Sequence, residues 1–198
     1  MTDVAADPEL TASDLRRMIE TARWHILRYD ALRASIANRA SLLISGNALL
    51  IGGVAILFPN TVGQDVAGGR LTLVVLAVGA FWVLGCSVFS VIYATKALLA
   101  GKSWRELYGQ EPPVSLFYQH SDTVRVAPDF ASFDTAFVEQ TLGRERESAT
   151  VNLWVVLQAH NYRYQFLRRA TRRLQLGLVV FAGSVVVAVA LSLIKLWS

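Results

Sequence analysis

The stretch that decides the fold runs over residues 40–64 and reads ASLLISGNALLIGGVAILFPNTVGQ, without one charged side chain. Two more uncharged stretches follow, at residues 71–95 and 174–194. Each holds roughly 17–24 mostly apolar residues, the length that a helix needs to cross a bilayer core of about 30 Å. A chain of 198 residues is too short to bury three such helices in a soluble core. The sequence therefore predicts an all-α integral membrane protein, with transmembrane helices at residues 41–58, 71–94 and 174–195.

The basic residues predict how these helices are oriented. Of the 19 Lys and Arg residues, six precede the first expected span and eleven lie between the second and the third. Only Arg70 and Lys195 lie elsewhere in the chain. Basic residues beside a span remain in the cytoplasm. We therefore expect a cytoplasmic N-terminus and an external C-terminus.

The segments next to the first and third spans have helical patterns of their own. Apolar residues recur from Leu15 to Ile36 at alternating spacings of three and four, which marks one face of a helix. A heptad-like series runs from Leu153 to Leu174. We therefore expect both spans to be continuous with long cytoplasmic helical stems. The remaining expected parts are a disordered N-terminus at 1–11, an amphipathic stem at 12–40, an external loop at 59–70, a cytoplasmic helical domain at 95–173 and an external tail at 196–198.

Local signals predict where the helices begin and end. Thr11 and Asp14 have the spacing of a capping box, so the first helix should begin near residue 12. Pro59 is expected to end it. Residues 113–133 lack periodicity and should form an ordered loop. A short helix at about 134–142 and a long helix from about residue 147 should follow.

Small side chains line one helical face of the first span and one of the third. Such faces let membrane helices approach closely, because lipid provides no hydrophobic drive for their association. They can pack within one subunit or between subunits, and the sequence leaves both alternatives open. The residues are Ser41, Ser45, Ala48 and Gly52 in the first span and Gly177, Ser184, Ala188 and Ser192 in the third.

Asn47 lies near the middle of the first span, where its amide must find a hydrogen-bond partner or water. One interpretation is an interhelical hydrogen bond. The other is a residue that lines a polar constriction of an oligomeric pore. No span carries a charge at its centre, which argues against a proton relay, a voltage sensor or a charged ion filter.

A basic cluster leads into the third span, from Arg163 to Arg173. It can anchor the topology and attract anionic headgroups, or some of its arginines can bind a phosphate-bearing ligand. Arg144 and Arg146 lie further from the membrane and are better ligand candidates, although an ordinary solvated or packed face explains them as well. The candidate ligand-binding residues are Tyr118, His120, Arg125, Arg144, Arg146, Trp154, His160 and Arg163.

Motifs for catalysis are missing from the sequence. The three histidines, His25, His120 and His160, lie far apart and have no cysteine partner, so we expect no metal site. The chain has no Gly-rich phosphate loop and no nucleophile elbow. We therefore expect neither an enzyme nor a cofactor. The net charge of +4 follows from juxtamembrane arginines and requires no nucleic-acid partner.

Three segments resemble the Pycsar transmembrane effectors. Residues 39–50, RASLLISGNALL, are similar to the first-span signature of that family. Residues 114–118, VSLFY, with the later Phe130 and Phe133, resemble its aromatic loop after the second span. Residues 159–168, AHNYRYQFLR, resemble the stretch before the last span, with Arg-Tyr where the family usually has Lys-Tyr.

The resemblance implies an effector of bacterial antiphage defence, in the cytoplasmic (inner) membrane. Such a protein oligomerises and impairs the membrane when a cyclase releases a cyclic pyrimidine mononucleotide, cyclic UMP or cyclic CMP. The expected partners are thus the lipid bilayer, further copies of the chain and this nucleotide. The alternative from the residues alone is a non-enzymatic membrane scaffold whose cytoplasmic helices recruit a partner. An ion channel or transporter subunit is disfavoured, because the spans have neither charges nor broken helices.

Overall fold

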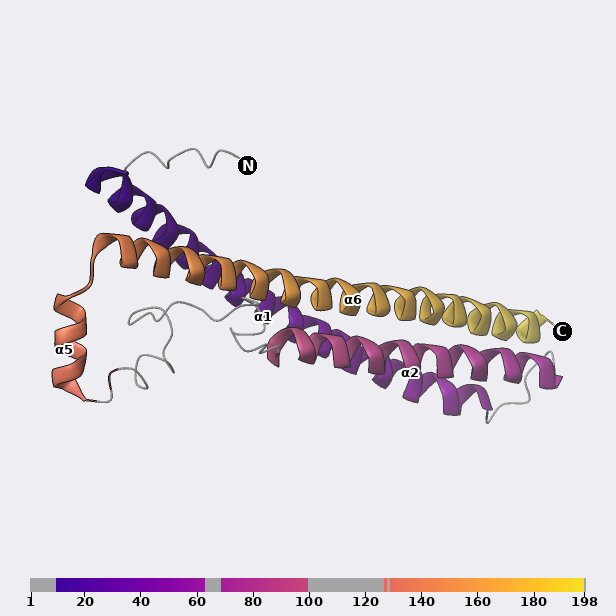
Figure 1. Cartoon of the computed structure of the whole chain (residues 1–198). Coiled ribbons are helices and arrows are strands. Elements are labelled where there is room, and N and C mark those ends of the chain that lie inside the picture. The colour runs from indigo at the N-terminus through magenta and orange to yellow at the C-terminus, as the bar shows by residue number, and fades with distance from the viewer. Residues whose placement is uncertain (1–9, 63–68, 100–126, 128, 198) are drawn as a thin grey trace, which may run out of the picture. The chain divides into compact units, whose positions relative to one another are not determined.

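The computed structural model describes residues 10–62, 69–99, 127 and 129–197, and every element in this part of the chain is a helix (Figure 1). The helices are α1 (Ala12–Val62), α2 (Gly69–Leu99), α5 (Phe130–Val138) and α6 (Leu142–Trp197). Among the described residues, α1, α2 and α6 each contain a stretch long and apolar enough to cross a membrane. The prediction of an all-α chain with three such helices is confirmed, and the fold is compatible with a multi-pass membrane protein. Insertion and sidedness stay predictions.

The start of α1 follows the expected capping box. The Asp14 backbone N–H donates to Thr11 Oγ1 at 3.2 Å, and the Thr11 backbone N–H donates to Asp14 Oδ2 at 3.2 Å. The Thr11 hydroxyl also donates to Asp14 Oδ2, which lowers the pKa of this carboxyl below its ordinary value. Two backbone donors that lack a partner inside the helix are thereby satisfied.

Other helix boundaries differ from the expectation, since α5 ends at Val138 rather than near residue 142 and α6 begins at Leu142 rather than near residue 147. Helix α1 continues past Pro59 to Val62, so the expectation that the proline ends it is wrong. A proline removes one N–H donor and its ring crowds the carbonyl four residues earlier, but here it lies in the last turn, where few hydrogen bonds of the helix follow it. Helix α5 begins at Phe130, where a loop was expected. Asp129 caps it, since its carboxylate accepts from the Ser132 backbone N–H at 2.8 Å. Residues 113–126 of the expected loop lie outside the described residues.

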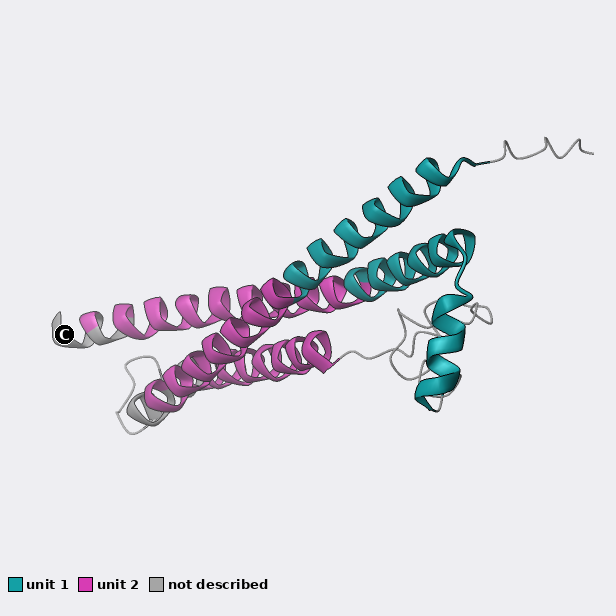
Figure 2. Cartoon of the chain, turned by 90° about the vertical axis from the view of Figure 1, so that its left-hand side faces the viewer, with its two compact units in different colours: residues 1–33, 101–161 teal, residues 34–100, 162–198 magenta. Residues whose placement is uncertain are grey.

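The chain divides into two compact units, one of residues 1–33 and 101–161 and the other of residues 34–100 and 162–198 (Figure 2). In the first unit, α1 packs on α6. Ile19 and Ala22 are buried on the face expected to be apolar. Arg23 forms an ion pair with Glu145, and the Tyr29 ring meets the His160 ring edge-on at 5.2 Å.

The second unit brings together α2 with the later parts of α1 and α6. Four alanines, at most 1% exposed, lie where these helices meet, together with the larger buried side chains of Ile36 and Leu167. Alanine has no side chain beyond Cβ, so the helices can pack closely at this level. A second buried cluster joins Leu50, Val54 and Val83 further along the same helices. The alanines are Ala40, Ala94, Ala97 and Ala170.

Candidate functional site

Asn47 joins three helices through a chain of hydrogen bonds in the second unit. Its side chain is fully buried, and Nδ2 donates to the Leu43 carbonyl at 2.7 Å and to Ser90 Oγ at 2.9 Å. The Ser90 hydroxyl in turn donates to the Ala170 carbonyl of α6 at 2.9 Å. The first interpretation of Asn47 was an interhelical hydrogen bond, and a single copy of the chain already contains this bond.

Two polar atoms beside this chain of hydrogen bonds have no partner among the described residues. They are Asn47 Oδ1, which can only accept, and the hydroxyl of Ser87, one helical turn before Ser90. Both side chains are fully buried. Leaving such a group without a partner costs about 1–3 kcal/mol. The part of the network that holds the helices together is therefore the Asn47–Ser90–Ala170 line.

The small face of the first apolar segment is exposed in the described part of the chain. Ser41, Ser45 and Ala48 are all exposed. Gly52 is exposed too, and a Cβ added there would meet no atom within 4 Å. We call these four exposed residues the α1 small face.

The corresponding face of α6 packs within the chain. A Cβ at Gly177 would lie 3.3 Å from Cys86 Cβ and 3.3 Å from Leu50 Cδ2. Ser184 Oγ lies 2.9 Å from the position of a Cβ at Gly79 of α2, and its hydroxyl donates to the Val180 carbonyl at 2.9 Å. Ala188 is half-buried. The side chain of Ser192 lies outside the described residues.

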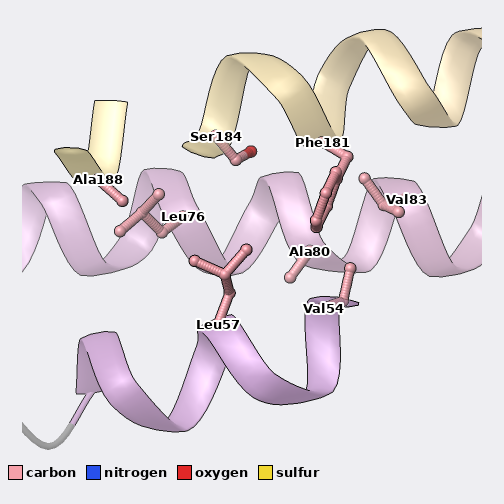
Figure 3. Close-up of a pocket in the computed structure, with 8 residues that line it drawn as sticks. All are labelled: Val54, Leu57, Leu76, Ala80, Val83, Phe181, Ser184 and Ala188. Atoms are coloured by element: carbon pink, nitrogen blue, oxygen red, sulfur yellow. The ribbon is translucent and has the colours of Figure 1, made fainter. Parts of the chain in front are cut away.

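Helices α1, α2 and α6 line a small, partly open cavity next to this face (Figure 3). Its volume is about 40 Å³, and the close-up shows Phe181 and Ser184 of α6 directed toward Leu57 of α1 and Ala80 of α2. Ser184 carries the one hydroxyl of the lining, and that hydroxyl is already bonded to its own helix. The cavity thus offers packing space, and no free polar group for binding or catalysis.

The candidate ligand-binding residues spread along α6. Arg144 and His160 lie sixteen residues apart, about 24 Å of helix, so one small ligand cannot contact both through this helix. Trp154 is 47% exposed, whereas Arg146 is half-buried and its Nε has no partner among the described residues. Arg163 belongs to the other unit. Tyr118, His120 and Arg125 lie outside the described residues, and a ligand role for these candidates stays a prediction.

A basic groove, which the sequence did not single out, lies between α1 and α6 in the second unit. Its volume is about 630 Å³. Arg39 comes from α1, and Arg168 and Arg172 come from successive turns of α6. Its remaining lining residues are Leu42, Leu43, Tyr164, Leu167, Thr171 and Gln175.

Geometry separates the groove arginines from their neighbours in the basic cluster. Arg169 lies over the Phe166 ring, with its guanidinium carbon 5.6 Å from the ring centroid. Arg173 is exposed and does not line the groove. The spacing of four between Arg168 and Arg172 could have predicted that they share a face. The contribution of Arg39, 129 residues away in the chain from Arg168, has no local signal.

Carboxylates are scarce around this groove. Residues 34–100 and 162–198 contain nine Lys and Arg but one acidic side chain, Asp65, which lies outside the described residues. Among the described residues, none of the three groove arginines forms a salt bridge. Their charges therefore remain uncompensated by the described part of the chain.

The described residues contain no group of three or more His, Cys, Asp or Glu that could hold a metal ion. Cys86, the single cysteine, is buried against Gly177. Comparison of the chain with protein-family models, with curated proteins and with solved structures yields no match.

Proposed function

We propose that the protein is a self-associating effector of bacterial antiphage defence, which crosses the inner membrane three times with its N-terminus in the cytoplasm. In this proposal, a cyclic pyrimidine mononucleotide triggers rearrangement of the oligomer, and the membrane loses its barrier function. The observation that carries self-association is the exposed α1 small face.

Large apolar side chains on the outside of the second unit support insertion into a bilayer. Leu42, Leu49 and Phe81 are each more than 70% exposed, and many other Val, Leu and Ile side chains of these segments are exposed as well. A contiguous apolar surface of this kind marks a membrane or protein contact. Lipid would cover it without cost, because acyl chains are as apolar as these side chains.

Self-association would use the α1 small face, where small side chains lie on the outside of the second unit. Between the exposed leucines of α1, the α1 small face leaves the helix backbone accessible to a second helix. Serine hydroxyls at Ser41 and Ser45 can also donate across such an interface. Two copies joined through this face would each keep the internal packing of α6 on α2.

The nucleotide response rests on the resemblance to the Pycsar effectors. The first unit offers exposed or half-buried basic and aromatic side chains, among them Arg144 and Trp154, that suit a phosphate and a base. Ligand binding there would have to change the membrane segments through α1 or α6, since both helices contribute residues to both units.

A leakage experiment tests the proposal. Purified full-length chain in dye-filled vesicles should release dye on addition of cyclic UMP or cyclic CMP. Gly52→Leu, which fills the α1 small face, should reduce this release. Gly183→Leu is the matched control, because Gly183 is also exposed with no atom within 4 Å of an added Cβ but lies on α6 outside its small face.

The outcome also separates the effector from the scaffold. Absence of leakage with every cyclic nucleotide, together with normal growth of cells that produce one, would contradict the effector proposal. A stable oligomer that is sensitive to Gly52→Leu but indifferent to nucleotides would instead support the scaffold.

A further inference from the structure

We propose that the basic groove between α1 and α6 binds the phosphate of an anionic phospholipid. The inference rests on the membrane-crossing part of the proposed function and does not depend on the nucleotide response. Three observations support it: the groove has three arginines from two helices, it has an apolar wall, and acidic side chains are nearly absent around it.

Charge is the first argument. Arg39, Arg168 and Arg172 line one groove without a carboxylate in its lining, and like charges held together repel each other. An anion between them would turn this repulsion into attraction. Guanidinium groups are well suited to phosphate, because their planar N–H donors bind two oxygens at once.

The position of the groove along both helices is the second argument. Arg39 directly precedes the uncharged stretch at 40–64, and Arg172 stands two residues before the uncharged stretch at 174–194. In a bilayer, these boundaries would lie at the level of the cytoplasmic headgroups, which is where basic pockets between helices bind anionic lipids. The groove would then face lipid phosphate at all times.

The lining provides a place for the rest of a lipid molecule. Leu42, which is 72% exposed, and Leu43 continue the groove from Arg39 into the apolar part of α1. An acyl chain can lie along them while the phosphate contacts the arginines. The Gln175 amide is a further donor in the lining, suited to a headgroup hydroxyl or ester oxygen.

A soluble phosphodiester such as a cyclic nucleotide shares the charge of a lipid phosphate. It has no acyl chain, however, so it would contact the arginines and leave the apolar wall of the groove at Leu42 and Leu43 unused. We therefore assign the groove to phospholipid, and the test below includes the soluble competitor.

The test measures which lipids stay with the protein. Full-length chain is reconstituted in phosphatidylcholine vesicles that contain phosphatidylglycerol or cardiolipin, extracted in detergent and analysed by mass spectrometry for retained lipid. The unmodified protein should retain the anionic lipid in preference to phosphatidylcholine. Replacing Arg39, Arg168 and Arg172 together by Gln should reduce this retention by about tenfold or more, since three charge-assisted contacts are lost.

A matched variant separates a built site from general attraction to a negative surface. Replacing Arg169 and Arg173 by Gln removes charges of the same helix that do not line the groove. This variant should retain anionic lipid as the unmodified protein does. Arg39→Lys keeps the charge but loses the two-oxygen geometry, so it should show intermediate retention and guards against loss of folding in the triple variant.

Three results would overturn the inference. They are equal retention of anionic and neutral lipid, equal loss in the groove and control variants, and displacement of the retained lipid by millimolar cyclic UMP or inorganic phosphate. Displacement would reassign the groove to a soluble phosphodiester or phosphate. Failure to reconstitute into vesicles would instead contradict the membrane-crossing proposal, so the two failures are distinguishable.

Discussion

The small faces of α1 and α6 have similar composition and opposite surroundings. In α6, Gly177 and Ser184 bring the helix against α2 within one copy of the chain. In α1, Ser45 and Gly52 are exposed, and a Cβ added at Gly52 would meet no atom within 4 Å. The comparison shows that small residues at helical spacing indicate where another helix can approach closely, but they do not indicate which helix does so. The α6 face is used inside the chain, whereas the α1 face remains available to another molecule.

The largest effect should come from filling the internal face. Gly177→Leu places a side chain where even a Cβ would lie 3.3 Å from Cys86 Cβ and from Leu50 Cδ2. Overpacking of this kind should lower the free energy of unfolding by about 2–3 kcal/mol. Thermal or SDS unfolding of the full chain in micelles measures it. An unchanged melting temperature would show that α6 does not pack as described.

Filling the external face should leave folding intact and weaken association instead. Gly52→Leu adds the same side chain in open space, so the free energy of unfolding should stay near that of the unmodified protein. The association constant in the bilayer should fall by about tenfold, or about 1.4 kcal/mol. Energy transfer between labelled copies, followed as vesicles are diluted with lipid, measures this loss. Equal weakening by Gly183→Leu would argue against a specific interface.

A substitution at Asn47 tests the buried face of α1, opposite in exposure to the α1 small face. Asn47→Leu removes both hydrogen bonds donated by Nδ2 but also removes the unpartnered Oδ1. The net loss in the free energy of unfolding should be about 1 kcal/mol, as for other interhelical hydrogen bonds in membrane proteins. Unfolding in micelles measures it, and leakage should change only through this loss. A large change in leakage with unchanged stability would favour the pore-lining interpretation.

The smallest effect should come from the cap of α5, outside the second unit. Hydrogen bonds from Ser132, led by its backbone N–H, hold the pKa of Asp129 below its ordinary value of 3.8. The ionised cap thus stabilises α5 at pH values above the ordinary pKa of Asp129. This stabilisation is lost as the pH falls through the lowered pKa of the folded protein. The protection of the α5 amides against hydrogen exchange, taken relative to the intrinsic exchange rate at each pH, should fall in acid and in Asp129→Ala.

Asn can also cap a helix, so Asp129→Asn should keep this protection and remove its dependence on the titration of Asp129. Neither variant should affect association or the melting of the long apolar helices. A change in either of these would show that the cap acts beyond α5.

The sequence predicted the long helices well because their signals are local. Three uncharged stretches and the capping box of Thr11 and Asp14 require only neighbouring residues to be recognised. The start of α5 was missed although its signal is equally local. Asp129 and Ser132 have capping spacing, but the surrounding residues lack the periodicity that would have drawn attention to a helix.

The candidate site depended on contacts that a sequence does not contain. Helical spacing places Ser41 and Gly52 on one face but does not tell whether α2 covers it. In the same way, the basic cluster was evident, yet its division into groove and surface arginines follows from the approach of α1 to α6, which brings Arg39 to Arg168. Such long-range packing decides which residues act together.

Disulfide cross-linking tests most directly whether the α1 small face joins two copies. Cys86→Ala removes the single cysteine with little change in packing, and cysteines are then introduced one at a time at positions 41, 45, 48 and 52, or at 183 as the control. In membranes under mild oxidation, the four α1 positions should form cross-linked dimers and position 183 should not. Equal cross-linking at all positions, or none on α1, would contradict the account.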